Sequence, residues 1–274
     1  MSAERVTIFL PELLRLQNLS EYKVHFARWN EVVHPLEVFA RDKKEWQQWQ
    51  EYWPGRDDFN RPFIFSLIQF YHETDTWLFG GIFRVVTRHG DRYEVELTET
   101  GHALIGRLKL RSDYRSRTTR VNLEKHFASF EVQEILREPY TGRSFPGYED
   151  IDVAFDELET LVKNDRPDWR AALESVRGIY LITDTKTDRR YVGSAYGEQG
   201  IWSRWRSYIE TGHGGNVELK SLVSEPTLAY SRANFRFALL EHRSIRTPDE
   251  VILDREAFWK RILLTRGEHG LNRN

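Results

Sequence analysis

A carboxylate on the inward face of a helix is the first side chain in this sequence that could do chemistry. Residues 249–264 are predicted to form a helix whose apolar positions follow one stripe: Ile252, Trp259, Ile262 and Leu263. Glu256 lies on the same face, and a carboxylate that faces a core is costly unless it is paired or binds a cation. Glu256 is therefore a candidate cation ligand. The alternative is a structural ion pair, for instance with Arg204.

Two tyrosines could project from one face of a β-hairpin. Tyr180 ends the tripeptide Gly-Ile-Tyr, Tyr191 begins Tyr-Val-Gly, and the turn-forming stretch 183–188 lies between them. A turn centred between Thr185 and Lys186 would bring the two tyrosines directly opposite each other, so that both phenols point the same way. The alternative is an ordinary cross-strand aromatic pair that only packs.

The predicted helix 199–211 brings an arginine beside a tyrosine. Its inward stripe consists of Ile201, Trp205, Tyr208 and Ile209. Arg204 and Tyr208 are four residues apart, so they are neighbours on one flank of the helix. A solvated surface charge is the alternative for Arg204.

These side chains belong to elements that together predict a small C-terminal α+β unit. The elements are strands 178–183, 189–194 and 234–241, helices 199–211 and 249–264, and a short helix from Val217.

Five segments of this unit resemble, in order and spacing, the GIY-YIG nuclease superfamily. They are Gly-Ile-Tyr at 178–180, Tyr-Val-Gly at 191–193, SRWRSY at 203–208, DREAFW at 254–259 and the asparagine within GLNRN at 270–274. The resemblance covers about 176–274 and is closest to the homing and restriction branch. It implies a small α/β sandwich with a three-stranded, mainly antiparallel sheet, and metal-dependent hydrolysis of phosphodiester bonds in DNA.

The resemblance also implies roles for the chemical side chains. Tyr180 and Tyr191 match the two phenols of the first motif, one of which would be the general base or its partner. Arg204 matches the arginine that stabilises the charge of the pentavalent phosphate. Glu256 matches the single metal-binding carboxylate, with one Mg²⁺ or Mn²⁺ per active site. A phenol with an ordinary pKa of about 10 is a poor base at neutral pH, so the identity of the base stays open.

Other positions add candidate contacts. By the resemblance, Tyr208 could donate or relay a proton, and Asn272 would make a phosphate or fold contact. Arg206 and Lys220 are candidate DNA contacts.

The stretch 212–216 has two interpretations. Gly212 as the residue that ends one helix, followed by Asn216 as the N-cap of the next, is the favoured one. In the other, His213, Asn216 and the N-terminus of the second helix bind a DNA phosphate, and Lys220 contacts the DNA one helical turn further on.

The first part of the chain is predicted to be a compact, barrel-like β domain. A helix over 36–53, with Trp46, Trp49 and Trp53 on one face, precedes the strands. The predicted strands are 63–70, 77–87, 92–98, 103–110 and 130–136. One interpretation is a PUA-like or similar barrel that recognises DNA or a modified base. Packing in a core is the more common fate of such aromatic residues.

A basic segment, 107–125, favours nucleic acid as the partner of this domain. Its candidate DNA contacts are Arg107, Lys109, Arg111, Arg115, Arg117 and Arg120.

A Pro- and Gly-rich stretch, 139–148, ends the β domain. A helix over 151–162, with one apolar stripe, and a second helix from near Pro167 follow. The predicted domains are 1–145 for recognition, 146–175 as a helical linker and 176–274 for catalysis.

Composition limits the remaining function classes. The chain has no cysteine, which excludes disulfides, thiol nucleophiles and zinc–thiolate sites. No apolar run is long enough to span a bilayer, and the first residues do not resemble a signal peptide, so we expect a cytoplasmic protein without a membrane partner. The net charge of −2 gives no global attraction to nucleic acid.

We therefore expect a metal-dependent DNA endonuclease of restriction or phage-defence type, with target recognition by the N-terminal domain. Double-stranded DNA is the expected partner, and cutting both strands with one small active site would favour a homodimer. The alternatives are a DNA-binding or regulatory protein with a silent nuclease domain, and a homing or repair nuclease.

Overall fold

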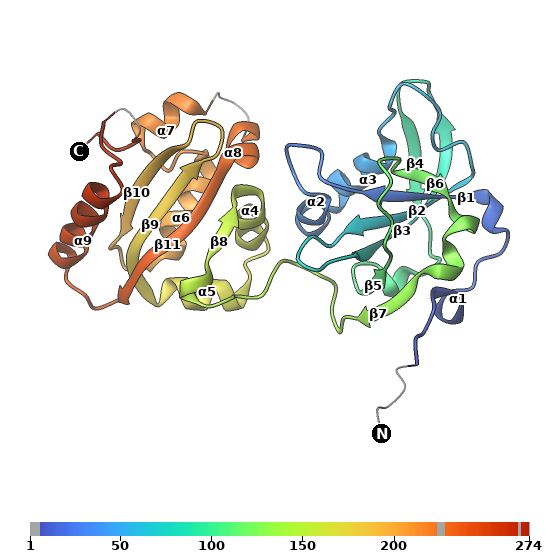
Figure 1. The fold of residues 1–274 in the computed structure, drawn as a ribbon, viewed down its shortest axis with the longest axis horizontal. Helices are drawn as coiled ribbons and strands as arrows, with labels where there is room; N and C mark the ends of the chain where they lie inside the picture. Colours follow the sequence, from blue (N-terminus) through green and yellow to red (C-terminus); the bar gives the residue numbers. More distant parts are fainter. Residues whose placement is uncertain (1–5, 224–227, 268–269, 274) are drawn as a thin grey trace. The chain divides into compact units, whose positions relative to one another are not determined.

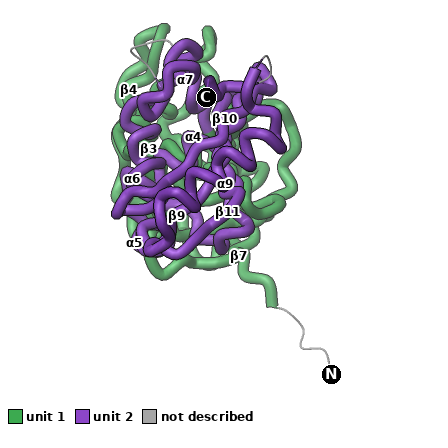
Figure 2. The backbone as a smooth tube through the Cα atoms, turned by 90° about the vertical axis from the view of Figure 1, so that its left-hand side faces the viewer, with its two compact units in different colours: residues 1–30, 34–140 green, residues 31–33, 141–274 purple. Residues whose placement is uncertain are grey.

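Strands from the two halves of the chain form two separate sheets in the computed structural model, one in each of two units (Figures 1 and 2). The structure describes residues 6–223, 228–267 and 270–273. Unit 1 comprises residues 1–30 and 34–140, and unit 2 comprises residues 31–33 and 141–274. Both units are α+β. Within the described residues, no helix has the length and apolar character needed to cross a membrane.

Unit 1 is built on a curled, mixed sheet in the order β6-β1-β2-β3-β5-β7, with β4 paired to β3 (Figure 1). Its strands are β1 (Tyr22–Ala27), β2 (Phe63–Gln69), β3 (Thr76–Arg88), β4 (Tyr93–Leu97), β5 (Leu108–Arg111), β6 (Arg120–Asn122) and β7 (Glu131–Ile135). Strands β1 and β2 are parallel, and the other pairs are antiparallel. Helices α1 (Leu10–Leu13), α2 (Pro35–Arg41) and α3 (Lys43–Glu51) and 3-10 turns at Leu19–Glu21, His102–Leu104, Leu123–Lys125 and Phe127–Ser129 complete it.

Four of the five strands predicted for this unit are confirmed, as β2, β3, β4 and β7. The predicted strand 103–110 is wrong in its first half, because Gly101 and Gly106 adopt positive φ angles of 72° and 70° and turn the chain there. Strands β1 and β6 were not predicted. The large aromatic side chains Phe26, Phe65 and Phe79 are fully buried, so core packing is their role.

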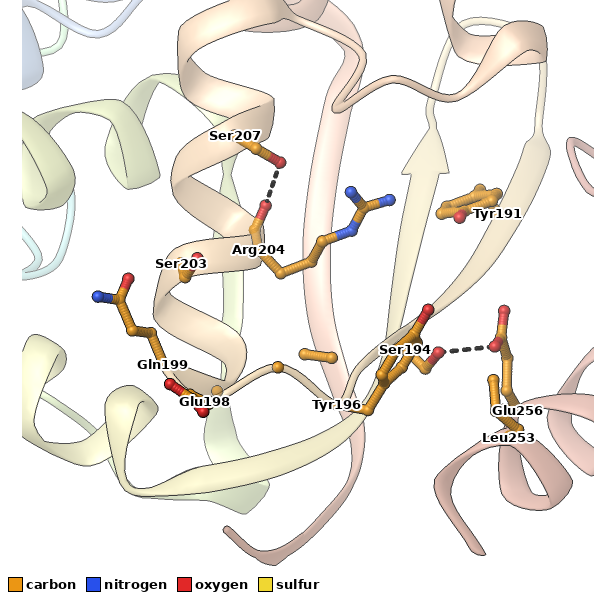
Figure 3. A pocket seen from close by; sticks show the side chains of 13 residues that line it. Tyr191, Ser194, Tyr196, Glu198, Gln199, Ser203, Arg204, Ser207, Leu253 and Glu256 are labelled. Atoms are coloured by element: carbon orange, nitrogen blue, oxygen red, sulfur yellow. Dashed lines mark hydrogen bonds between the residues drawn. The ribbon is translucent and has the colours of Figure 1, made fainter. Parts of the chain in front are cut away.

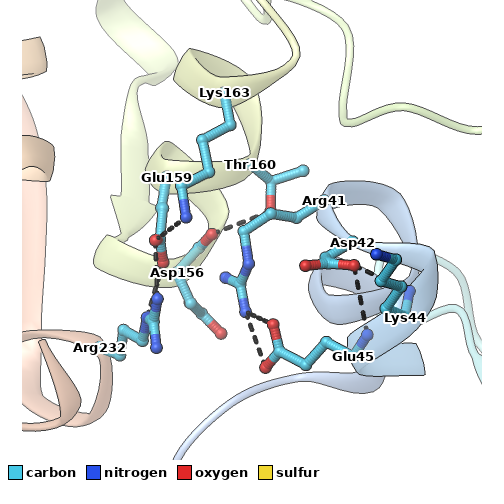
Figure 4. A network of polar contacts seen from close by, with 9 residues as sticks. All are labelled: Arg41, Asp42, Lys44, Glu45, Asp156, Glu159, Thr160, Lys163 and Arg232. Atoms are coloured by element: carbon cyan, nitrogen blue, oxygen red, sulfur yellow. Dashed lines mark hydrogen bonds and ion pairs between the residues drawn. The ribbon is translucent and has the colours of Figure 1, made fainter. Parts of the chain in front are cut away.

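The predicted helix 36–53 is two helices. Asp42 is extended, with φ −148°, and its carboxylate accepts hydrogen bonds from the backbone N–H groups of Lys44 and Glu45 at 2.8 and 3.2 Å (Figure 4). It therefore ends α2 and caps α3. Trp46 is 2% exposed and donates from Nε1 to Gly80 O at 3.0 Å, whereas Trp53 lies beyond the end of α3.

Unit 2 contains an antiparallel sheet in the order β10-β9-β11-β8 (Figure 1). Its strands are β8 (Asp152–Ala154), β9 (Val176–Asp184), β10 (Arg189–Ala195) and β11 (Phe235–Ser244). Its helices are α4 (Phe155–Lys163), α5 (Pro167–Glu174), α6 (Gly200–Thr211), α7 (Val217–Leu222), α8 (Ala229–Asn234) and α9 (Asp249–Ile262), with a 3-10 turn at Tyr148–Asp150.

Among the described residues, the sheet has four strands where the resemblance implies three, and the difference lies in residues 151–154. These were expected to begin a helix over 151–162, but residues 152–154 are extended and pair with β11, and α4 begins only at Phe155. The segment 146–175 shares the core of unit 2, since Val153, Leu158 and Trp169 are buried with the residues of β9 and α6.

Alternation along the strands gives the sheet two apolar faces. Tyr180 and Ile182 of β9 pack toward α4, α5 and α6. The residues that alternate with them point the other way: Ile179 lies in a second cluster with Val192 of β10 and Ile252 of α9, and Leu181 packs against this cluster. The sheet is therefore covered on one face by α4–α6 and on the other by α9.

A buried carboxylate ties the helices on the first face together. Glu159 of α4 has no exposed surface and accepts from Arg232 of α8 through both of its oxygens, at 2.7 and 2.8 Å (Figure 4). Lys163 adds a second ion pair at 2.7 Å. A buried charge is tolerated in this way only when it is paired.

Candidate active site

The hairpin tyrosines share one face of the sheet, but the predicted register is wrong. Tyr180 pairs with Gly193, and Tyr191 pairs with Ile182. The turn is shifted because the Asp184 carboxylate accepts from Lys186 N and Thr187 Oγ1, and Asp188 takes a left-handed conformation. A shift of two residues keeps each side chain on its face. The two phenol rings are therefore diagonal neighbours, with centroids 6.5 Å apart.

The glycine of Tyr-Val-Gly makes room for this arrangement. A Cβ atom at Gly193 would lie 2.4 Å from the Tyr180 hydroxyl and 2.5 Å from its ring carbon Cζ. Gly214, in the loop after α6, has the same relationship with the ring of Tyr208, at 2.5 Å. Both glycines are thus required by tyrosines that cross over the backbone.

Arg204 donates hydrogen bonds to two buried phenols. Its Nε donates to Tyr180 Oη at 3.0 Å, its Nη2 to Tyr208 Oη at 3.3 Å, and its Nη1 to Gly214 O at 3.0 Å. The two hydroxyls are themselves 3.0 Å apart. Tyr180 and Tyr208 are fully buried, while Arg204 is half-buried. The Arg204 side chain extends from α6 toward Tyr191 (Figure 3). This network fixes the direction of the guanidinium.

Burial changes the electrostatics of two of the three phenols. Burial raises the pKa of Tyr180 and Tyr208, neighbouring tyrosines add to the shift, and the opposing effect of Arg204 is smaller. Both groups are neutral at physiological pH and can only donate or accept hydrogen bonds. Tyr191 is the tyrosine of the three that lines a surface hollow.

Glu256 reaches the site from α9, on the other face of the sheet. Its Oε2 accepts from Ser194 Oγ at 2.6 Å (Figure 3). Its Oε1 forms an ion pair with Lys260 Nζ at 2.9 Å. The alternative partner considered from the sequence, Arg204, is bound to the tyrosines instead. The predicted inward stripe of α9 is correct for Ile252 but wrong for Ile262, which is 53% exposed.

A second carboxylate anchors α9. Glu241, next to an irregularity in the register of β11, accepts from Trp259 Nε1 at 3.0 Å and from Arg255 Nε at 2.8 Å. Burial would raise the pKa of Glu241, but these hydrogen bonds outweigh it and lower the pKa. Since Glu256 lies between the two donors in sequence, this contact determines which way it faces.

Two hollows meet at these side chains. One, of about 710 Å³, is lined by the end of β10, the loop after it, α6 and α9 (Figure 3). The other, of about 620 Å³, is lined by the loop after α6, α7, α9 and the C-terminal segment. Both are lined by Tyr191, Arg204, Leu253 and Glu256. An extended ligand could therefore follow the edge of β10 past one shared centre.

Asn272 supports the fold at this edge. Its Oδ1 accepts from Val192 N at 2.9 Å, and its Nδ2 donates to Val192 O at 2.8 Å, although β10 is the last strand of the sheet on this side. The side chain thus satisfies backbone groups that an edge strand leaves open. The resemblance implies either a phosphate contact or a fold contact for Asn272, and the hydrogen bonds with Val192 are a fold contact.

The loop before α7 has the favoured capping geometry. Gly212 ends α6 with φ 78°, and Asn216 Oδ1 accepts from Leu219 N at 2.8 Å. His213 Nδ1 accepts from Gly215 N at 3.0 Å, within the loop itself. Lys220 is exposed on α7. Gly214, Gly215 and Asn216 of this loop line the second hollow, so the loop itself borders the hollow without a charged side chain.

Arg206 lies away from the shared centre. It pairs with Glu210 at 2.9 Å and lines a different hollow with residues of α4 and α8. Two residues along a helix correspond to opposite flanks, so Arg206 and Arg204 cannot face one site.

The basic segment of unit 1 does not form one charged surface. Lys109 is 5% exposed and pairs with Glu134 at 3.0 Å, and Arg120 is 9% exposed and donates to Tyr52 O at 2.8 Å. Arg107 donates to the backbone of Leu136 and Ala103. Arg111, Arg115 and Arg117 are exposed, with Arg115 paired to Asp75. The buried members hold unit 1 together and cannot reach a phosphate.

Sequence reasoning missed two residues at the centre. Lys260 follows Glu256 by four positions on a predicted helix, which is a signal for an ion pair. Ser194 required the side-chain direction at the end of β10, which the sequence pattern did not provide.

The donor set at Glu256 fits only one type of metal site. In the described part of the chain, no group of three or more His, Asp or Glu side chains is arranged to hold a metal ion. A cation held by one carboxylate, and otherwise by water and a substrate phosphate, fits the habits of Mg²⁺. Glu256, which borders both hollows, could provide that carboxylate.

Comparison with known proteins gives one match to report. No family model and no curated protein matches the chain. Among solved structures, the chain is similar to the catalytic domain of the homing endonuclease I-TevI, with 27% identity over 36% of this chain and 98% of that chain, and a TM-score of 0.27. A TM-score this low does not establish a shared fold, so the function of unit 2 is proposed below from its own residues.

Proposed function

We propose that unit 2 is a GIY-YIG nuclease domain that hydrolyses phosphodiester bonds in DNA with one divalent cation. The observation that best supports this is the shared centre of the two hollows, where a fixed guanidinium, a phenol and a carboxylate meet. A phosphodiester needs an activated water, neutralisation of the non-bridging oxygens and stabilisation of the leaving group. These three side chains are suited to the first two of those tasks.

Arg204 is the proposed electrophilic group. Attack of water on phosphorus increases the negative charge on the non-bridging oxygens, and a guanidinium already oriented by Tyr180 and Tyr208 stabilises that charge without reorganising. The two buried phenols are then positioning residues, because their raised pKa values make them unsuitable as bases.

Tyr191 and Glu256 are assigned the remaining roles. Glu256 would hold the cation, which when bound lowers the pKa of a water molecule and neutralises phosphate charge. Tyr191 borders both hollows and would orient that water or take part in its deprotonation.

Unit 1 is proposed to provide target recognition, which would make the protein a restriction or phage-defence nuclease. The exposed residues Arg111, Arg115 and Arg117, which could contact phosphates, support this proposal. Cutting both strands with one centre per chain would require two chains.

One observation favours a second candidate. Lys260 already forms an ion pair with Glu256 at 2.9 Å, as it would if unit 2 were a DNA-binding domain without catalysis. Tyr191, Arg204 and Glu256 together weigh against this alternative, since binding alone does not need all three.

A cleavage assay separates the two. Wild type and Glu256→Gln are incubated with modified phage DNA and with unmodified DNA, in Mg²⁺ or EDTA. The matched control is Glu210→Gln, an exposed carboxylate of α6 outside the shared centre. We expect cutting by wild type and the control in Mg²⁺ only. Binding of DNA without cutting by any protein would favour the silent domain, and equal cutting of both DNAs would rule out the interpretation that unit 1 recognises a modified base.

A further inference from the structure

Both oxygens of the Glu256 carboxylate are already engaged. Ser194 Oγ donates to Oε2 at 2.6 Å, and the Lys260 ammonium lies 2.9 Å from Oε1. The side chains of Glu256 and Lys260 are each 13% exposed, so water screens this pair less than an ordinary surface pair. A divalent cation on Oε1 would have to take the place that the ammonium now occupies.

Lys260 also borders the second hollow. A phosphate bound in that hollow could form an ion pair with the Lys260 ammonium. That hollow is lined by the backbone of Gly214 and Gly215 and by Asn216. Arg273, another basic residue there, forms an ion pair with Glu218. Lysine carries its charge on a flexible four-carbon chain, so a rotamer change can move the ammonium between neighbouring acceptors.

We propose that Lys260 is an internal counter-ion that a divalent cation displaces from Glu256, and that the released ammonium then binds a DNA phosphate in the second hollow. The inference rests on the proposed function, since it requires Glu256 to bind the cation. Two positive charges cannot share one carboxylate oxygen at contact distance without strong repulsion. Metal binding therefore requires Lys260 to move, and a phosphate nearby lowers the cost of that move.

Two consequences follow for binding. Lys260 weakens the affinity for the cation when DNA is absent, because the ammonium competes for the carboxylate. It also couples the two ligands: the cation strengthens DNA binding, and by thermodynamic reciprocity DNA strengthens cation binding by the same factor. A smaller fraction of the protein would then hold the cation when DNA is absent.

The first test measures Mn²⁺ binding without DNA, from the electron paramagnetic resonance signal of free Mn²⁺. Lys260→Met removes the charge and keeps the length of the side chain, and Lys260→Gln is a second variant in case the first does not fold. Arg261→Met is the matched control, since it removes one positive charge from an exposed position of the same helix. We expect about tenfold tighter Mn²⁺ binding by the Lys260 variants, the size expected for a partly screened charge pair. Arg261→Met should bind as wild type does.

The outcomes distinguish two failures. If Glu256→Gln binds Mn²⁺ as tightly as wild type, Glu256 is not the ligand, and the metal role in the proposed function is wrong. If Glu256→Gln loses binding but the Lys260 variants bind as wild type does, the displacement of Lys260 is wrong while the metal role stands.

The second test measures the coupling by fluorescence anisotropy of a labelled DNA duplex, with and without Ca²⁺. We expect Ca²⁺ to strengthen duplex binding by wild type and Arg261→Met severalfold, and to strengthen binding by the Lys260 variants less, because only the direct contact of the cation with a phosphate remains in those variants. An equal effect of Ca²⁺ on all four proteins would overturn the coupling.

Discussion

Arg204 and Glu256 reach the same centre from opposite faces of one sheet. Arg204 extends from α6 on the face that carries Tyr180, and Glu256 extends from α9 on the face that carries Val192. They can meet because β10 is the edge strand, so that both side chains border the same two hollows (Figure 3). The geometry of the candidate site therefore depends on that edge.

The guanidinium of Arg204 should be needed for turnover and not for DNA binding. Arg204→Lys keeps a positive charge but cannot donate to both phenols and face the hollow at once. We expect cleavage to slow by about 100-fold, the cost of removing one preorganised donor to a developing charge. Single-turnover cleavage and duplex binding are the measurements. Tyr208→Phe, which leaves the bond to Tyr180, should slow cleavage less; an effect of Tyr208→Phe as large as that of Arg204→Lys would contradict the division of roles.

Gly193 should tolerate no side chain. Gly193→Ala places a Cβ atom 2.4 Å from the Tyr180 hydroxyl, so the ring or the strand must shift. We expect unit 2 to lose about 1–3 kcal/mol of stability through overpacking. Gly197→Ala is the control, because nothing lies within 4 Å of a Cβ atom there. Thermal unfolding of both variants checks this, and equal melting temperatures would show that Tyr180 does not lie over the glycine.

Asn272 should stabilise β10 and not bind DNA. Asn272→Ala leaves the N–H and C=O of Val192 without their partners, which we expect to cost about 1–3 kcal/mol. Hydrogen exchange at the Val192 amide should accelerate, while Arg273→Ala, next to it and exposed, should leave that amide protected. A loss of DNA affinity by folded Asn272→Ala, with Val192 still protected, would instead indicate a phosphate contact.

Glu157 should make the stability of unit 2 depend on pH. Burial raises the pKa of this carboxyl from 4.5 to about 7, against the effect of Arg143, whose Nε lies 2.8 Å from Oε1. The folded state thus binds more protons than the unfolded state between these values, so stability falls as the pH rises from about 4.5 to about 7 and is constant above. The fall should reach about 3 kcal/mol.

Denaturant unfolding across this pH range measures the effect. Glu157→Gln cannot ionise, so its stability should vary less over the range and should exceed that of wild type at pH 8. Glu210→Gln, whose carboxylate is exposed, should behave as wild type does. A wild-type curve that rises through this range would mean that Glu157 is better stabilised when ionised.

The spacing of apolar residues and the positions of turn-forming residues predicted most of the strands and helices of unit 2, because each long element buries one continuous face. A short element was not predicted: β8 spans only Asp152–Ala154 and is extended because it pairs with β11, which no local sequence pattern indicates. The hairpin register was misjudged for a related reason. It depends on hydrogen bonds from the Asp184 carboxylate within the turn, not on the apolar residues of the strands.

The sequence predicted which residues form the candidate site better than it predicted how they are arranged around the sheet. Arg204 beside Tyr208, and Glu256 facing inward, follow from helical spacing. The arrangement did not follow in the same way: Arg204 approaches the face of the sheet that carries the tyrosines, whereas Glu256 comes around the edge of β10 from the other face. Edge position depends on the order of strands in the sheet, which the spacing of residues along one chain does not determine.

The most direct test of the proposed centre is the rate at which the intact protein nicks supercoiled DNA in Mg²⁺, with and without Glu256→Gln. Wild type should convert plasmid to nicked or linear DNA, and Glu256→Gln should bind the same DNA but cut at least about 100-fold more slowly, since a neutral amide replaces the carboxylate that is proposed to hold the cation. Cutting by Glu256→Gln at the wild-type rate would contradict the assignment of this centre as the nuclease active site.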